Sequence, residues 1–201
     1  MAYRSLRPFD VVVNDGLPVT VREVVPEDSD LIDLGFDRLS KQSRLFRFMA
    51  AKTHLTDREL QQFSALNTMD HAAFGALHML ENEAQPAGIA RYIRTHMDSE
   101  AAEIAVTVVD AYQNRGIGTL LLGVLATTAC ANGITEFLAL VAQENNGMRH
   151  LLRELGGTEE TAEEPEINIV LPIYQDPMSY PDNKLRGYIR QAYSQAELVA
   201  M

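Results

Sequence analysis

The sequence has a single cysteine, Cys130, in 201 residues, and this scarcity excludes a fold held together by internal disulfide bonds. One thiol agrees with the reducing cytosol, so we expect a cytoplasmic protein. No apolar run approaches the roughly 18 residues that a membrane span needs. The opening segment "MAYRSLRPFD" also lacks the apolar stretch of a signal peptide, and we therefore expect no membrane association.

Basic residues are scarce as well: 17 lysines and arginines stand against 28 aspartates and glutamates, which gives a net charge of −11. This balance argues against nucleic acid, whose binding asks for a basic stripe. The acidity suits solubility alone, or the attraction of a cationic substrate such as a protonated amine. The five histidines are scattered, and none has a cysteine or carboxylate at metal-ligand spacing, so we expect no metal site.

The length suffices for one buried core and not for two ordinary domains, so we expect a single domain over residues 1–201. Hydrophobic periodicity and turn residues predict a mixture of helices and strands, that is, an α+β fold. An N-terminal hairpin turns at residues 14–16. The expected helices cover 26–40, 41–49, a segment from 56, 118–133, 145–157 and about 182–199, and the expected strands cover 71–80, 87–96, 102–109, 135–142 and 166–174.

The most informative stretch is "QNRGIG", residues 113–118, which joins a β-branched strand to a leucine-rich helix. It is no P-loop, because Gly118 is followed by Thr119 rather than by lysine. It is no dinucleotide fingerprint either, because Leu121 stands where the third glycine belongs. Bare N–H groups at such a turn suit a pyrophosphate, with Arg115 as an added cation. The alternative is a tight turn whose glycines serve geometry alone.

The motif and its position between strand and helix resemble those of the GNAT superfamily of N-acetyltransferases. The order of the elements agrees over residues 19–173. Within the superfamily, stretches such as "AEIAVTVVDAYQNRGIG" and "ENNGMRHLLRELG" are closest to the catalytic domain of bacterial protein lysine acetyltransferases of the Pat type. The resemblance implies a GNAT fold, with a mostly antiparallel sheet that splays at two parallel strands.

The same resemblance implies a cosubstrate, acetyl-CoA, in the wedge between those strands. It assigns the pantetheine and thioester to the strand, the pyrophosphate to the glycine loop and the helix start, and the pantetheine arm to the next helix. The residues are Val106, Thr107 and Val108; Gln113, Asn114, Arg115, Gly116, Ile117, Gly118 and Thr119; and Asn145 and Met148. Asn145 also fits an ordinary helix N-cap, and the two roles can coexist.

Glu103 begins an apolar strand, where loss of solvation would raise the pKa of its carboxyl toward that of a general base. The resemblance places the catalytic base at this glutamate. The alternative is a solvated carboxylate at the end of the strand, with or without an ion pair to Arg91 or Arg94 on the neighbouring strand. With no cysteine in the motif to carry an acetyl group, direct attack by the amine is expected.

The chain departs from the family pattern at Leu152, where many members carry a tyrosine that reprotonates the leaving thiolate. Other acids would be His150, Tyr174, Tyr180 or Tyr188, or CoA leaves as the thiolate. The resemblance favours a protein lysine as the acceptor. A small-amine acetyltransferase and a non-catalytic acyl-CoA sensor are the alternatives, and a homodimer is possible.

Overall fold

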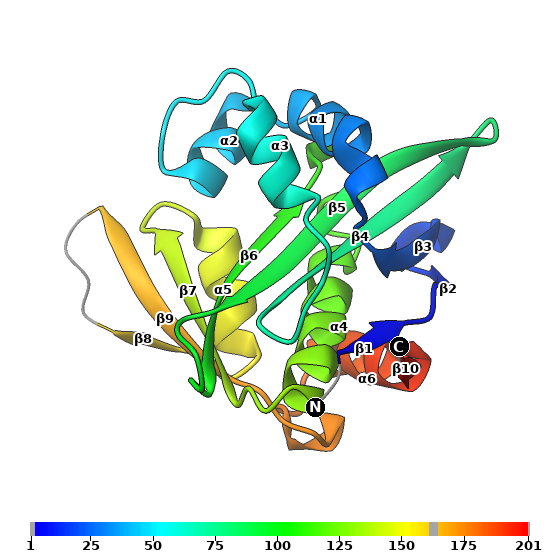
Figure 1. Cartoon of the computed structure of the whole chain (residues 1–201). Helices are drawn as coiled ribbons and strands as arrows, with labels where there is room; N and C mark the ends of the chain where they lie inside the picture. The colour runs from blue at the N-terminus through cyan, green and yellow to red at the C-terminus, as the bar shows by residue number, and fades with distance from the viewer. Residues whose placement is uncertain (1–2, 161–164, 201) are drawn as a thin grey trace.

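The computed structural model describes residues 3–160 and 165–200, and its centre is a mostly antiparallel sheet (Figure 1). This confirms the predicted α+β class. The eight strands lie in the order β2 Phe9–Val12, β3 Pro18–Glu23, β4 His71–Leu80, β5 Glu83–Arg94, β6 Ala101–Val108, β7 Glu136–Ala142, β9 Glu166–Pro172 and β8 Thr158–Glu160. Among the described residues, β6 and β7 are the parallel pair of this sheet.

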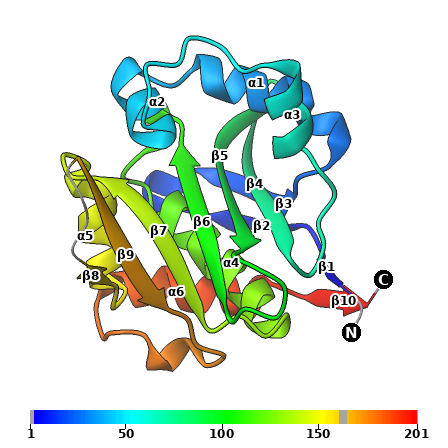
Figure 2. The same cartoon turned by 60° about the vertical axis from the view of Figure 1, so that its left-hand side comes forward.

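Helices cover both faces of the sheet (Figures 1 and 2). One face carries α1 Ser29–Asp37, α2 Lys41–Phe48 and α3 Asp57–Phe63, and the other carries α4 Ile117–Ala131, α5 Asn146–Glu154 and α6 Lys184–Gln195. Helix α4 is apolar all round and buried along most of its length, which makes it the centre of the larger core. A smaller apolar cluster lies under α1, α2 and α3.

Strand alternation sorts the side chains of β5 and β6 between these two faces. Ala90, Tyr92 and Ala102 belong to the α4 core, whereas Arg91 lies opposite Ala105, and Ile93 opposite Glu103, on the other face. Glu103 and Arg91 therefore share the face that α1, α2 and α3 cover only in part.

The parallel pairing of β6 with β7 covers three residues of each strand. The register runs from Ala101 opposite Glu136 to Glu103 opposite Leu138 and stops there. Figure 2 shows the two strands diverging beyond this point. The splay that the resemblance implied is thus present, and Glu103 stands at the fork.

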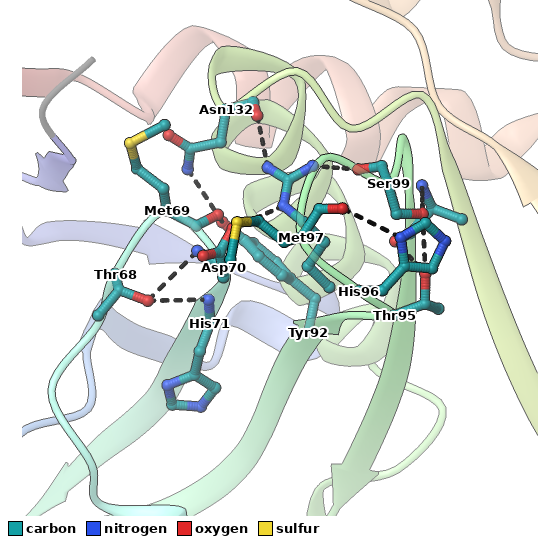
Figure 3. A network of polar contacts seen from close by, with 12 residues as sticks. Thr68, Met69, Asp70, His71, Tyr92, Thr95, His96, Met97, Ser99 and Asn132 are labelled. Carbon is teal, nitrogen blue, oxygen red and sulfur yellow. Dashed lines mark hydrogen bonds and ion pairs between the residues drawn. The ribbon is translucent and has the colours of Figure 1, made fainter.

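A network of polar contacts holds the closed end of this fork together (Figure 3). The guanidinium of Arg94 makes an ion pair with Asp70 at 2.7 Å and donates hydrogen bonds to the backbone oxygens of Ser99 and Asn132. The Asn132 amide in turn donates to the Tyr92 hydroxyl at 2.9 Å. These bonds join the loops before β4 and β6 to the end of α4.

The C-terminal segment differs from the predicted helix over residues 182–199. Helix α6 ends at Gln195, and β10 Leu198–Ala200 pairs with β1 Arg4–Leu6, which brings the two ends of the chain side by side. Three residues of alternating strand are too few to be told from a helix end by periodicity. No helix within residues 3–160 and 165–200 is long and apolar enough to cross a membrane.

Candidate active site

A cleft of about 1600 Å³ opens where β6 and β7 part. Its walls come from both strands, the first turn of α4, and parts of α2, α5 and α6. Glu103 borders it, and so do the predicted cofactor residues with the exception of Arg115: Val106, Thr107, Val108, Gln113, Asn114, Gly116, Ile117, Gly118, Thr119, Asn145 and Met148. Arg115 is half-buried, and its carbonyl accepts a hydrogen bond from the Asn14 N–H at 3.1 Å.

The glycine loop presents a row of bare backbone donors to this cleft. Within the part of the chain that the structure describes, the N–H groups of residues 114–119 have no acceptor, and the first bond of α4 runs from Leu120 N–H to the Gly116 carbonyl at 2.9 Å. Asn114 and Gly116 have φ values of 61° and 88°, the left-handed region. Such a concave row of N–H groups at a helix start attracts an anion with several oxygens.

Two residues that sequence reasoning did not place at the cofactor loop brace it from outside. The Tyr188 ring of α6 packs so closely on Gly116 that a Cβ there would lie 2.4 Å from the ring. The Tyr188 hydroxyl donates a hydrogen bond to the Asn14 side chain, whose backbone N–H holds the loop at Arg115. Lys184 and Gln191 of α6 border the same cleft. These contacts join Asn14, the glycine loop and α6, which are far apart in the sequence, so no pattern of neighbouring residues predicts them.

Hydrogen bonds also tie the loop to α2. The Gln113 amide donates to the Val108 carbonyl at 3.1 Å and to the Ser43 hydroxyl at 3.4 Å. Burial alone would raise the pKa of the Asp110 carboxyl, but hydrogen bonds from Ser40 and Ser43 hold it below its ordinary value. The ionised Asp110 therefore fixes the start of α2 beside the cofactor loop.

Glu103 is exposed, which differs from the expected loss of solvation. The reason is the fork itself, since β7 turns away beyond Leu138 and leaves the carboxylate facing the open cleft. The described residues give it no ion pair: Arg94 is paired with Asp70, and Arg91 has no carboxylate partner. The exposed side chain therefore agrees with the alternative of a solvated carboxylate, but the ion pair with Arg91 or Arg94 is absent among the described residues.

Helix α5 supplies the opposite wall. The Asn145 side chain caps it by accepting the Met148 N–H at 3.1 Å, so the N-cap role is present at a residue that also borders the cleft. Leu152 is fully buried in the core and faces away from the cleft. The side chain at position 152 therefore cannot protonate the leaving thiolate, and it does not face the cleft.

Among the other candidate acids, Tyr188 and His150 border the cleft, while Tyr174 and Tyr180 do not. Burial raises the pKa of Tyr180 to about 12. Cys130 also lies outside the cleft, and burial raises the pKa of its thiol to about 11, which makes it a poor nucleophile. No metal-ligand cluster of histidine, cysteine or carboxylate side chains occurs in the described residues.

Residues 40–156 match the acetyltransferase (GNAT) family. An acetyltransferase of Pseudomonas aeruginosa is 30% identical over 72% of this chain and 77% of its own length. The acetyltransferase Pat of Mycolicibacterium smegmatis is 32% identical over 75% of this chain, which corresponds to 44% of that longer relative.

Solved structures agree with these relatives. The GNAT domain of the Streptomyces lividans protein PAT superposes with a TM-score of 0.76 at 25% identity, covering 83% of this chain and 97% of that domain. A spermidine N-acetyltransferase of Vibrio cholerae, solved with CoA and spermine, shares the fold with a TM-score of 0.60 at 15% identity. The superposition covers 77% of this chain and 95% of the Vibrio cholerae chain. The chain therefore belongs to the acetyltransferase (GNAT) family and is an acetyl-CoA-dependent N-acetyltransferase.

Proposed function

We propose that the protein transfers the acetyl group of acetyl-CoA to a lysine side chain of a protein, with Glu103 as the general base. One observation carries the proposal: the carboxylate at the fork of β6 and β7 and the bare N–H groups of the glycine loop border one continuous cleft. A cleft with an anion-binding loop and a base suits a substrate that is a pyrophosphate at one end and a reactive thioester at the other.

In this proposal the N–H groups of residues 114–119 hold the pyrophosphate, and Lys184 and Tyr188 lie beside it. The pantetheine arm lies along Val106, Thr107 and Val108, whose strand edge beyond Glu103 has no partner in β7. Asn145 and Met148 form the far wall.

The reaction begins when Glu103 removes a proton from the lysine ammonium, directly or through one water. The neutral amine attacks the thioester carbonyl carbon, a C–N bond forms, and the carbonyl oxygen takes up negative charge. Backbone N–H groups on the free edge of β6 stabilise that oxygen. The C–S bond then breaks and CoA leaves as the thiolate, since Leu152 occupies the position of the family's tyrosine. The attacking nitrogen loses its second proton to solvent, which leaves the neutral amide, and the thiolate takes up a proton from solvent.

A protein acceptor is favoured over a small amine by the exposure of the cleft. Ile93 and Leu140, which border it on the face of Glu103, are 40% and 52% exposed. An enclosed amine pocket would bury such side chains, whereas an open groove admits a lysine on a protein surface. A small cationic amine is the second candidate, because the net charge of −11 attracts cations.

The Glu103→Gln variant tests the base. We expect kcat to fall about 100-fold or more, with the affinity for acetyl-CoA unchanged, because the amide keeps the shape but cannot accept the proton. Calorimetric titration with acetyl-CoA and steady-state kinetics with lysine peptides and polyamines measure both. Glu144→Gln, an exposed glutamate outside the cleft, is the matched control. Undiminished acetyl transfer at matched binding would remove Glu103 as the base.

A further inference from the structure

Two arginines on the Glu103 side of the cleft have no anionic partner. Arg91 on β5 is 6% exposed, and its Nε is buried without a hydrogen-bond acceptor. Arg47 on α2 is half-buried, and within residues 3–160 and 165–200 neither side chain makes a hydrogen bond or an ion pair. Both border the cleft. A buried charge without a partner is costly, and proteins ordinarily pair such groups.

The surroundings of these arginines are aromatic and basic rather than acidic. The guanidinium carbons of Arg47 and Arg91 lie 5.7 and 5.2 Å from the centre of the Phe63 ring, which offsets part of their charge. Burial first, and then the charge of Arg91, lower the pKa of Arg47 to about 10. Burial and Arg91 also lower the pKa of His71, which lies on the same face. In a chain of net charge −11, this is a local excess of positive charge.

Arg91 lies close to the proposed base along the sheet. It is opposite Ala105, and Glu103 is two residues further along the same face of β6, a separation of about 7 Å along the strand. A bare lysine ammonium that approached Glu103 would be repelled by the two guanidinium groups. An acceptor that brings a carboxylate as well as the amine would instead satisfy the buried donors.

We propose that Arg47 and Arg91 form a carboxylate-binding subsite, and that the preferred acceptor carries a carboxylate close to the amine that is acetylated. The subsite rests on the proposed function for its role in the reaction. The carboxylate is either the side chain of an acidic residue beside the acceptor lysine or the α-carboxylate of a free amino acid. Both use the same charge-assisted hydrogen bonds to guanidinium.

The test measures equilibrium binding to protein loaded with CoA, so that no turnover is needed. Titration calorimetry compares a single-lysine peptide with flanking glutamates to its glutamine counterpart, and compares lysine to cadaverine, which lacks the carboxylate. In the wild-type protein we expect at least one carboxylate-bearing partner to bind about tenfold more tightly. A preference within the peptide pair identifies an acidic side chain, and a preference for lysine over cadaverine identifies an α-carboxylate.

The variants locate the effect. Arg91→Gln and Arg47→Gln should each reduce the preference toward unity while CoA affinity stays unchanged. Arg47 is a half-buried helix residue, so its variant remains informative even where Arg91→Gln fails to fold. The control is Arg58→Gln, an exposed arginine of α3 outside the cleft, which should keep the preference.

Equal binding within both pairs would overturn the subsite, and so would a preference that survives the Arg47 and Arg91 substitutions. The absence of binding by all four acceptors to CoA-loaded protein would overturn it as well. A preference that is present without any acetyl transfer would leave the subsite standing and contradict the proposed reaction. If the wild-type protein does not bind CoA, the result contradicts the proposed cofactor site. It does not bear on the carboxylate-binding role of Arg47 and Arg91.

Discussion

Asp28 is a buried carboxylate, and its charge is retained by specific partners. Arg22 of β3 donates two hydrogen bonds to it at 2.6 Å, and the Val25 N–H donates a third at 2.9 Å. Burial alone would raise the pKa of Asp28, but these donors hold it below its ordinary value. The pair ties the sheet to the start of α1 and so supports the face that carries Arg91 and Glu103.

Because the folded-state pKa of Asp28 is depressed, the stabilisation is present above the unfolded-state value of about 3.9 and is lost as the pH falls through the folded-state value. We expect Asp28→Asn to lower the free energy of unfolding at pH 7 by about 2 kcal/mol, which is within the range for hydrogen bonds to a charged group. The difference from wild type should shrink below about pH 4. Urea unfolding at several pH values measures it.

Asp30→Asn is the control for this variant, since Asp30 is an exposed carboxylate in the first turn of α1, two residues after Asp28. Its unfolding free energy should stay within about 0.5 kcal/mol of wild type. If the difference in unfolding free energy between wild type and Asp28→Asn stays constant from pH 7 to pH 3, the stabilisation does not come from the ionised Asp28 carboxylate.

For single residues, the sequence predicts a role where the neighbouring residues along the chain determine it. Gly116 is the N-cap of α4 and Gly118 lies in the first turn of that helix, within the six-residue motif of residues 113–118. Thr56 and Glu59 form a capping box at the start of α3. The solvation of Glu103 was mispredicted because it depends on where β7 turns away, which no neighbouring residue encodes. Tyr188 at the glycine loop is likewise a contact between distant segments.

At the scale of elements, α6 is held against α4 by small residues. A Cβ on Gly123 would lie 2.6 Å from the Ala192 Cβ and 3.4 Å from the Ile189 Cα. The two helices can therefore approach this closely only because residue 123 has no side chain. The contact matters for the cleft because α6 brings Tyr188 and Lys184 to its border.

We expect Gly123→Ala to cost about 1–3 kcal/mol of unfolding free energy through overpacking. It should also weaken acetyl-CoA binding, since α6 must shift away from the glycine loop. Thermal unfolding and calorimetric titration measure the two effects. In Gly187→Ala, also on α6, the new methyl group meets nothing within 4 Å, so this variant should gain up to about 1 kcal/mol. Similar stability changes in both variants would contradict the packing argument.

The extents of most elements could be read from their periodicity, because each strand or helix shows its own pattern of burial. Their partners could not. The runs that became β6 and β7 are both mostly apolar, so nothing in either shows that pairing stops after Glu103 and Leu138. The pairing of β10 with β1 joins two three-residue strands from opposite ends of the chain, beyond the reach of any local pattern.

At the scale of the whole molecule, the fork gives the sheet two free edges in its middle. Beyond Glu103 and Leu138, β6 and β7 present backbone groups to the cleft rather than to each other. Buried backbone groups need partners, and unpaired strand edges invite wrong ones. A ligand that fills the fork therefore completes the fold as well as the active site.

We expect CoA to raise the melting temperature, because it binds the native state and not the unfolded chain. At 100 times its dissociation constant the gain is about 2.7 kcal/mol, or roughly 5–10 °C for a chain of this size. Differential scanning fluorimetry with CoA measures it, with NAD as the control that should give no shift. Equal shifts with CoA and NAD would contradict specific occupation of the fork.

The edges of β6 and β7 that face the open fork thus stay unpaired until acyl-CoA binds between them. Molecules without acyl-CoA unfold more often, and unfolded molecules are the ones that proteases remove. The lifetime of the protein in a cell is then expected to follow the supply of acyl-CoA. Because the pairing of β6 with β7 stops after three residues, we expect the abundance of the enzyme to rise with the supply of the metabolite that it consumes.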